Sequence, residues 1–296
     1  NGDAFMSIRL ENVSFSYLED TPMSQAALRN VSLEIEEGEF VGLIGPTGSG
    51  KSTLIQHFNG LLKPNSGKVY VDGVDLTLKD TQLRLIRQKV GMVFQYPEHQ
   101  LFGETVLEDV GFGPRNGGLS EEAVVQRVRE ALAYVGLEYE TIRDQSPFEL
   151  SGGQKRRVAI AGVLAMQPSV LILDEPTAGL DPEGREEILG EIRQLHEERG
   201  ITVVLVTHSM EDVARLVDRL IVMERGSIAL DGTPVEVFGQ VARLKKMGLG
   251  VPEITELMHE LKARGLDVNT DILTVAKAEE EIIRLIESRK VMGWQK

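Results

Sequence analysis

Residues 45–52 read Gly45-Pro46-Thr47-Gly48-Ser49-Gly50-Lys51-Ser52. They match the phosphate-loop pattern, in which a glycine and four further residues precede Gly-Lys-Ser or Gly-Lys-Thr. The flanking residues agree, because residues 40–44 resemble a short buried strand and residues 53–58 the first turns of a helix. A glycine-rich turn that binds nothing is the alternative, and the order of strand, loop and helix argues against it.

The residue types of this loop suit a bound phosphate. Three glycines allow the backbone N–H groups to turn inward around an anion, and the following helix directs its positive end to the same place. Lys51 is expected to reach the outer phosphates, and the Ser52 hydroxyl is expected to ligate Mg²⁺. The sequence therefore predicts a site for ATP and Mg²⁺ in residues 45–52, together with Thr53.

The composition limits what else the chain can be. Its 296 residues suffice for one large domain with an appendage or for two domains, and 42% apolar and 26% charged residues are ordinary for a globular protein. The net charge of −14 argues against nucleic acid or an anionic membrane as a partner, but not against ATP held in a local nest. Cysteine is absent, so we expect neither disulfides nor a cysteine metal site, which suits the cytoplasm.

Nothing in the sequence predicts a membrane-spanning segment. No apolar run approaches the ~20 residues of a membrane span, and we expect no signal peptide ahead of the first strand. Residues 1–5, which precede Met6, fit a remnant of an expression tag.

The first part of the chain predicts an antiparallel sheet. Residues 8–17 and 27–35 alternate apolar and polar side chains, as half-buried strands do. Residues 68–71 are followed by Asp72-Gly73, which is a hairpin signal. A further strand is predicted over residues 90–94.

The remainder predicts a parallel sheet that is interrupted by helices. From about Glu104 to Met166 the apolar residues recur at helical spacing. Strands then return and alternate with helical segments, as in a sheet with crossover connections, at residues 171–174, 202–207 and 220–223. The helical stretch is thus predicted to be an insertion, at about residues 98–167, in an α/β domain that spans residues 6–240.

A small helical C-terminal domain is predicted over residues 241–296. The strand–helix alternation ends near residues 238–250, and two apolar stripes at helical spacing follow. The stripes consist of Ile254, Leu257, Met258 and Leu261, and of Ile282, Ile283 and Ile286. They either form dimer contacts or cover the domain's own core.

Two adjacent carboxylates end an apolar strand at residues 170–173. Neighbouring side chains on a strand point in opposite directions, so Asp174 and Glu175 should have different roles. Asp174 is expected to hold Mg²⁺ through water, and Glu175 to orient or deprotonate the water that attacks the γ-phosphate. An acidic turn without a catalytic role is the alternative.

The sequence Leu150-Ser151-Gly152-Gly153-Gln154 predicts the start of a helix. Ser151 and Gln154 have the spacing of a capping box. The first turn then holds Lys155, Arg156 and Arg157, whose positive charges oppose the helix dipole. Either a bound anion offsets this arrangement, or the three basic side chains are simply solvated.

The phosphate loop, the Leu150–Gln154 motif and the Asp174-Glu175 strand, in this order, resemble the nucleotide-binding domain of ABC ATPases over about residues 8–237. The resemblance implies a RecA-like α/β phosphate-loop domain with an antiparallel β subdomain and an inserted helical subdomain. It also implies an ATPase that works as a head-to-tail dimer. Ser151, Gly152, Gly153 and Gln154 of one chain would close over ATP on the phosphate loop of a second chain, identical or different.

Further residues match roles that the resemblance implies. Tyr17 stands where the family stacks an aromatic ring on adenine, although an ordinary sheet aromatic explains it equally well. Gln95 matches the residue that contacts Mg²⁺ and the attacking water, and His208 matches the switch histidine at the γ-phosphate. Asp181, in the run of residues 178–181, matches the loop that crosses the dimer interface.

Residues 94–102 and 108–114 are similar to those of energy-coupling-factor ATPases, which drive uptake of vitamins, cobalt or nickel. This resemblance implies a transmembrane coupling subunit, a substrate-binding membrane subunit, and a position on the cytoplasmic face of a bacterial or archaeal membrane. It places a groove for the coupling subunit at Tyr96, Glu98, Gln100 and Phe102. Glu98 would pair with an arginine of that subunit, or would be a solvated carboxylate.

Two alternatives remain for the function. One is the ATPase of a different ABC importer or exporter, because the sequence does not encode the direction of transport. The other is an ABC ATPase that serves assembly or repair rather than transport. The lack of cysteine disfavours a zinc-containing repair type, and no long coiled-coil insertion separates Lys51 from Asp174.

Overall fold

The structure is a computed structural model that describes residues 6–19 and 21–291. The segment proposed as an expression remnant, residues 1–5, lies outside these ranges, as do the last five residues of the predicted C-terminal domain. Within the described ranges, no helix combines the length and the apolar character needed to cross a membrane.

The antiparallel sheet is built by the first part of the chain, as predicted. Its strands lie in the order β2-β1-β4-β5. Between β4 and β5 the chain turns at Asp72 and Gly73, whose φ angles are 46° and 76°, as a two-residue hairpin requires. The strands are β1 Met6–Tyr17, β2 Gln25–Glu36, β4 Ser66–Val71 and β5 Val74–Asp75.

The second sheet has six strands in the order β10-β9-β3-β8-β7-β6. Neighbouring strands are parallel except β10, which pairs antiparallel with β9. The carboxyl ends of β3, β6, β7 and β8 therefore share one edge, where ligands of α/β proteins bind. The strands are β3 Phe40–Ile44, β6 Val90–Val93, β7 Val170–Asp174, β8 Thr202–Val206, β9 Arg219–Glu224 and β10 Ser227–Gly232.

This sheet separates two apolar cores. Val41 and Leu43 of β3 face the first core, which the antiparallel sheet, α1 (Lys51–Phe58) and α2 (Leu83–Lys89) complete. Phe40 and Ile44 face the second core, to which α7 (Pro182–Arg199) and α8 (Met210–Leu216) contribute. Both faces are covered, which explains why the central strands are continuously apolar rather than alternating.

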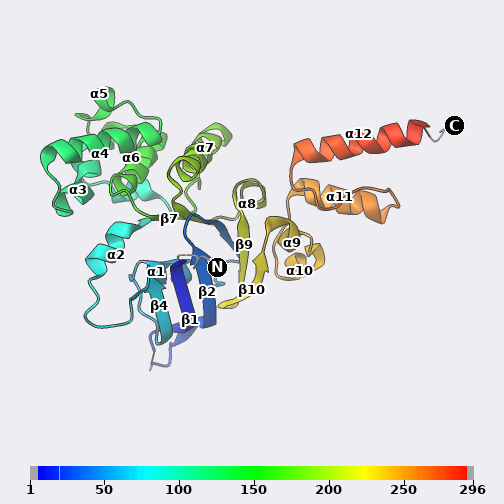
Figure 1. The fold of residues 1–296 in the computed structure, drawn as a ribbon, viewed down its shortest axis with the longest axis horizontal. Helices are drawn as coiled ribbons and strands as arrows, with labels where there is room; N and C mark the ends of the chain where they lie inside the picture. The colour runs from blue at the N-terminus through cyan, green and yellow to red at the C-terminus, as the bar shows by residue number, and fades with distance from the viewer. Residues whose placement is uncertain (1–5, 20, 292–296) are drawn as a thin grey trace, which may run out of the picture.

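The helical insertion lies between β6 and β7. In Figure 1 its green helices form a lobe beside the sheets, which we call the helical lobe. Its helices are α3 Val106–Asn116, α4 Glu121–Tyr134, α5 Tyr139–Ile142 and α6 Gly152–Leu164, with the short 3-10 helices η1 Pro97–Gln100 and η2 Pro147–Glu149.

The C-terminal helices α11 (Glu253–Ala263) and α12 (Val275–Val291) project on the opposite side from the helical lobe (Figure 1). Their own core, formed by Met258, Val268, Ile272 and Ala278, begins later than the predicted boundary at residue 241. The preceding helices α9 (Pro234–Phe238) and α10 (Val241–Lys246) pack on the main domain. The apolar stripe of α11 faces this small core in part, whereas Ile283 and Ile286 of α12 are exposed.

Candidate functional site

The phosphate loop joins β3 to α1 and requires glycine at two positions. At Gly45 a Cβ atom would lie 2.4 Å from the Met223 carbonyl oxygen, and at Gly50 it would lie 2.5 Å from the Ala27 carbonyl oxygen. Gly50 has φ of 103° and caps the N-terminus of α1. The loop therefore packs too tightly for other residues, and α1 directs its positive end toward it.

Lys51 folds back over the loop. Its Nζ donates hydrogen bonds to the carbonyl oxygens of Gly45 (2.7 Å) and Pro46 (3.2 Å). Burial lowers the pKa of Lys51, while the nearby carboxylates of Glu175 and Asp174 act in the opposite direction. The ammonium group thus lies against the backbone of the phosphate loop, where a phosphate oxygen could replace the two carbonyl acceptors.

Tyr17 lies at the end of β1 and is 40% exposed. Its hydroxyl lies 3.1 Å from Thr53 Oγ1, and its ring meets the edge of Phe15 with 4.9 Å between the ring centroids. With residues 25–27 and 48–53 it lines a cavity beside the phosphate loop. The stacking of the Tyr17 ring on adenine stays a prediction.

Asp174 is the last residue of β7, Glu175 follows it, and the two have separate partners. Burial together with the charge of Glu175 raises the pKa of Asp174, and the nearby Ser52 hydroxyl acts in the opposite direction. Glu175 has φ of 51°, an uncommon value for a residue other than glycine, and its N–H donates to the Val206 carbonyl oxygen at 2.9 Å. The two carboxylates therefore have different surroundings, but the reason is the left-handed turn at Glu175, just beyond the end of β7, rather than the expected alternation along a strand.

Both oxygens of the Glu175 carboxylate are held by predicted site residues. Gln95 Nε2 donates to Oε2 at 3.1 Å, and His208 Nε2 lies 2.7 Å from Oε1. Gln95 follows β6, and His208 follows β8. Three strand ends thereby converge on one carboxylate beside the phosphate loop.

The Leu150–Gln154 motif forms the predicted capping box at the start of α6. Gln154 N–H donates to Ser151 Oγ at 3.3 Å, and Ser151 N–H donates to Gln154 Oε1 at 3.1 Å. A Cβ added at Gly152 or Gly153 would meet open space. The described residues that line the cavity beside the phosphate loop include none from this motif.

Two of the three basic side chains in the first turn of α6 pair with carboxylates of the same chain, so the alternative of simple solvation is wrong for them, and the bound anion stays a prediction. Arg156 pairs with Glu98, and Arg157 pairs with Glu187 and Glu191. Neither a bound anion nor simple solvation is therefore needed to explain these two arginines. The carboxylates come from η1 and α7, which local sequence spacing does not bring to α6.

Asp181 caps α7 at the position predicted to cross a dimer interface. Its carboxylate accepts a hydrogen bond from Gly184 N–H at 2.9 Å. Turn residues 177–180 line a surface cavity together with Glu175, Arg185 and His208. The dimer contact stays a prediction, and capping accounts for the aspartate within one chain.

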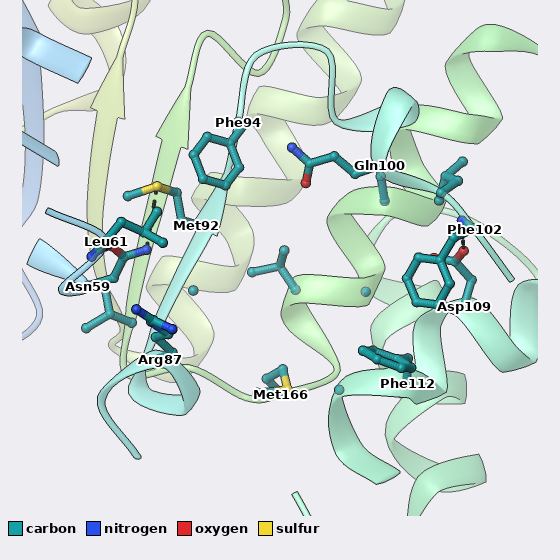
Figure 2. A pocket seen from close by; sticks show the side chains of 17 residues that line it. Asn59, Leu61, Arg87, Met92, Phe94, Gln100, Phe102, Asp109, Phe112 and Met166 are labelled. Carbon is teal, nitrogen blue, oxygen red and sulfur yellow. Dashed lines mark hydrogen bonds between the residues drawn. The ribbon is translucent and has the colours of Figure 1, made fainter. Parts of the chain in front are cut away.

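A groove separates the parallel sheet from the helical lobe (Figure 2). Gln100 and Phe102, two of the four residues predicted for it, line this groove. Asp109 fixes the backbone there by accepting from Phe102 N–H and Gly103 N–H, both at 2.7 Å. Other lining residues, which sequence reasoning missed, are Asn59, Leu61, Arg87, Met92, Phe112 and Met166.

The other two predicted groove residues lie elsewhere. Tyr96 and Glu98 are outside the lining of this groove. Both oxygens of Glu98 accept hydrogen bonds from Arg156 of the same chain, so the carboxylate has an internal partner, and its pairing with an arginine of another subunit stays a prediction. Exposed Tyr96 has its ring centroid 6.0 Å from the guanidinium carbon of Arg156.

Comparisons with known proteins agree with this architecture. A family model described as ABC transporter matches residues 28–178. The chain is 55% identical over 284 residues to the energy-coupling factor transporter ATP-binding protein EcfA2 of Clostridium tetani, covering 96% of this chain and 99% of that protein. The Clostridium perfringens protein of the same name is 57% identical over 283 residues, with the same coverage.

Solved structures show the same fold. The structure of cbiO1 from Clostridium perfringens, part of the ABC transporter complex cbiONQ, has a TM-score of 0.72 and 40% identity, covering 86% of this chain and 99% of that one. The dimeric ATP-binding cassette MJ0796, bound to ADP and Pi, has a TM-score of 0.69 and 37% identity, and the match covers 77% of this chain and 98% of that one. The predicted α/β phosphate-loop fold is confirmed.

Proposed function

This chain belongs to the ABC transporter family, among the ATP-binding subunits of energy-coupling factor transporters, and we propose that it powers uptake of a vitamin or a transition-metal ion such as cobalt or nickel. It is an ATPase subunit, and the hydrolysed molecule is ATP. The substrate class, the residue roles and the membrane contacts given below are inferences from the site.

The position of the Glu175 carboxylate is the main observation behind the proposed mechanism of ATP hydrolysis. Gln95 and His208 hold its two oxygens at the strand edge where the phosphate loop also lies. A carboxylate oriented in this way can accept the proton of the water that attacks the terminal phosphate. We therefore assign Glu175 as the general base, with Gln95 and His208 as the groups that orient it.

The residues beside Glu175 fit a magnesium ion. Ser52 and Asp174 supply a hydroxyl and a carboxylate that lie close together. Gln95 contacts Glu175 through its amide nitrogen, so its amide oxygen can face a cation. Mg²⁺ prefers a few protein oxygens together with water and phosphate oxygens, and it would supply charge neutralisation at the phosphates when bound.

Lys51 and the loop amides bind the phosphates themselves. The loop packs closely against neighbouring backbone at Gly45 and Gly50, and a loop held in this way needs little reorganisation when an anion arrives. The Lys51 ammonium exchanges its carbonyl acceptors for phosphate oxygens. Tyr17 borders the same cavity and would contact the adenine ring.

A second ATPase chain completes the site. The N-terminus of α6 carries a capping box, and the space at Gly152 and Gly153 is open. A helix N-terminus with uncovered N–H groups attracts phosphate. ATP between two chains would then favour the closed pair, and hydrolysis would release it. The second chain is a copy of this one or a related ATPase.

The groove of Figure 2 is proposed to receive a helix of a transmembrane coupling subunit. Aromatic and aliphatic side chains line it, including Phe94, Phe102 and Phe112. An amphipathic helix can bury its apolar face in such a groove. A substrate-binding membrane subunit would complete the complex, with this chain on the cytoplasmic face of the membrane.

An uptake assay tests this function. The gene would be replaced by the Glu175→Gln form in the source organism, and uptake of labelled vitamins, Co²⁺ and Ni²⁺ would be measured. We expect loss of uptake of at least one compound and its recovery with the wild-type gene. Unchanged uptake of every compound would contradict the proposal.

A further inference from the structure

Arg156 is a buried cation on α6 for which the proposed function gives no role. It is 2% exposed. Its Nε and Nη2 donate to the two carboxylate oxygens of Glu98 at 3.1 and 2.9 Å, and its Nη1 donates to the Ala178 carbonyl oxygen at 2.5 Å. One guanidinium group therefore joins α6, η1 and the turn between β7 and α7.

Both of the segments that Arg156 holds lead to Glu175. Glu98 lies three residues after Gln95, whose amide donates to Glu175 Oε2 at 3.1 Å. Ala178 N–H donates to the Glu175 carbonyl oxygen at 3.1 Å. The covalent chain and these hydrogen bonds form a closed ring through Glu98, Arg156, Ala178, Glu175 and Gln95.

The backbone conformation at Glu175 requires support from neighbouring residues. Its φ of 51° lies in the left-handed region, which a residue with a side chain keeps only where its surroundings enforce it. Two surrounding hydrogen bonds join Glu175 to Val206 and to Ala178. The hydrogen bond to Val206 of β8 restrains Glu175 on one side. Because Arg156 holds the carbonyl group of Ala178, it restrains the turn of residues 175–178 on the other side.

The other end of the ring reaches the groove. Glu98 lies in η1, and Gln100, the last residue of η1, lines the groove with Phe102 just beyond it. Two parallel hydrogen bonds between Arg156 and Glu98 fix the geometry of this charged pair. A molecule in the groove that moves η1 would therefore pull on Arg156 and on the turn that holds Glu175.

We propose that Arg156 is a positioning residue for ATP hydrolysis, which ties η1 to the turn after β7 and thereby fixes the Glu175 carboxylate. It touches neither the nucleotide nor the attacking water, and it acts through Ala178 and Glu98. The proposal rests on the assignment of Glu175 as the general base. It also provides a physical route by which occupancy of the groove would alter the hydrolysis rate.

Arg157, the next residue on α6, provides a matched control. It also pairs with carboxylates, those of Glu187 and Glu191, and it donates to the Val135 carbonyl oxygen at 2.8 Å. These partners lie on α7 and after α4, away from Glu175. Arg156 and Arg157 therefore have similar chemistry in the same helical turn, and the ring includes only one of them.

The test compares Arg156→Gln, Arg156→Lys and Arg157→Gln in the full chain, with steady-state ATP hydrolysis measured across MgATP concentrations. We expect Arg156→Gln to lower kcat by about tenfold or more, since misplacing a catalytic group by 1 Å can cost about 100-fold. Its KM should stay within about threefold, because the phosphate loop is intact. Arg156→Lys should recover part of kcat, and Arg157→Gln should stay within about twofold.

Two results would overturn the proposal. One is a folded Arg156→Gln protein whose kcat is within twofold of wild type, and the other is an equal kcat loss in Arg157→Gln. If Arg156→Gln does not fold, Glu98→Gln breaks the ring at its other partner with a side chain of similar size and should lower kcat in the same way. Where Arg156→Gln and Glu98→Gln both fold, the double variant should have a kcat no lower than that of the slower single variant. Additive losses of kcat in the double variant would be a third result against the proposal.

The outcomes separate this proposal from the assignment on which it rests. Glu175→Gln, measured in parallel, should abolish hydrolysis if Glu175 is the general base. An inactive Glu175→Gln with an unimpaired Arg156→Gln removes only the role of Arg156. A Glu175→Gln protein with wild-type activity removes the assignment of the general base itself.

Discussion

His208 Nε2 lies 2.7 Å from Glu175 Oε1, so a histidine at the end of one strand holds the carboxylate that follows the neighbouring strand. Gln95 holds the other oxygen of that carboxylate. If Glu175 is the general base, as we propose, these two contacts orient it and lower the reorganisation required during hydrolysis.

Replacing His208 should slow hydrolysis without preventing ATP binding. His208→Ala frees one oxygen of Glu175 and should lower kcat by roughly 10- to 100-fold, less than loss of the base itself. His208→Gln keeps an amide donor and should retain more activity than His208→Ala. Phosphate release at saturating MgATP measures both, and equal activity of His208→Ala and wild type would contradict the role.

Removing the Lys51 ammonium should weaken ATP binding. A charge-assisted hydrogen bond contributes about 1.5–3 kcal/mol, so Lys51→Ala should raise the Kd for ATP by roughly 10- to 150-fold. Lys63, whose Nζ contacts the Leu78 carbonyl oxygen at an exposed position, supplies the control Lys63→Ala. Calorimetric titration with ATP measures both, and similar affinities in the two variants would refute the assignment of Lys51.

A charge in the groove should disrupt assembly with the membrane subunits. Phe112 is 49% exposed and packs edge-on against Phe102 in the groove, with ring centroids 4.8 Å apart. Phe112→Glu would place a carboxylate where an apolar helix face is expected, while the ATP site is left intact. We expect loss of co-purification with the membrane subunits and a normal Kd for ATP.

Leu78 provides the control for this prediction. It is 60% exposed and lies outside the lining of the groove, so Leu78→Glu should assemble normally. If Phe112→Glu assembles as well as Leu78→Glu does, the coupling subunit binds at a different surface.

The Glu98–Arg156 pair should contribute stability that depends on pH. Burial acts to raise the pKa of Glu98, but the hydrogen bonds and charge of Arg156 outweigh it and hold the pKa below its ordinary value of 4.5. A lowered folded-state pKa means that the stabilisation is fully present above about pH 4.5 and is lost as the pH falls through the lowered value. Glu98→Gln should therefore reduce the free energy of unfolding at pH 7 by about 1–3 kcal/mol.

Urea denaturation of both proteins at a series of pH values measures this difference. Other carboxylates titrate in both proteins and cancel, so the gap between wild type and Glu98→Gln should close as Glu98 takes up its proton. A gap of the same size at acidic and neutral pH would show that the carboxylate charge is not what stabilises the pair.

Local sequence signals predicted the phosphate loop, several of the strands and turns, and the Asp174-Glu175 pair, whereas Gln95 and His208 were predicted only from the resemblance to ABC ATPases. The Asp72-Gly73 turn, the capping box of Ser151 and Gln154, and the strand that ends at Asp174 each depend on residues close together in the chain. Such signals require no knowledge of tertiary contacts.

The contacts that the sequence did not reveal join distant segments. Glu98 and Arg156 are 58 residues apart, and only the folded chain brings them together, so the internal partner of Glu98 could not be predicted from local spacing. The same holds for Arg87 of α2 and Phe112 of α3, which both line the groove. The helices after residue 241 pack partly on the main domain because Leu244, Leu249 and Val251 join its core, which helical periodicity alone does not predict.

The most direct test of the central claim combines assembly and hydrolysis. Tagged wild-type and Glu175→Gln chains would be purified from membranes of the source organism, the bound subunits identified, and ATP hydrolysis by each complex measured. We predict the same transmembrane subunits with both chains, and a loss of at least about 100-fold in kcat for Glu175→Gln, as removal of a general base causes. Recovery of soluble partners alone, or equal hydrolysis by the two complexes, would contradict the account.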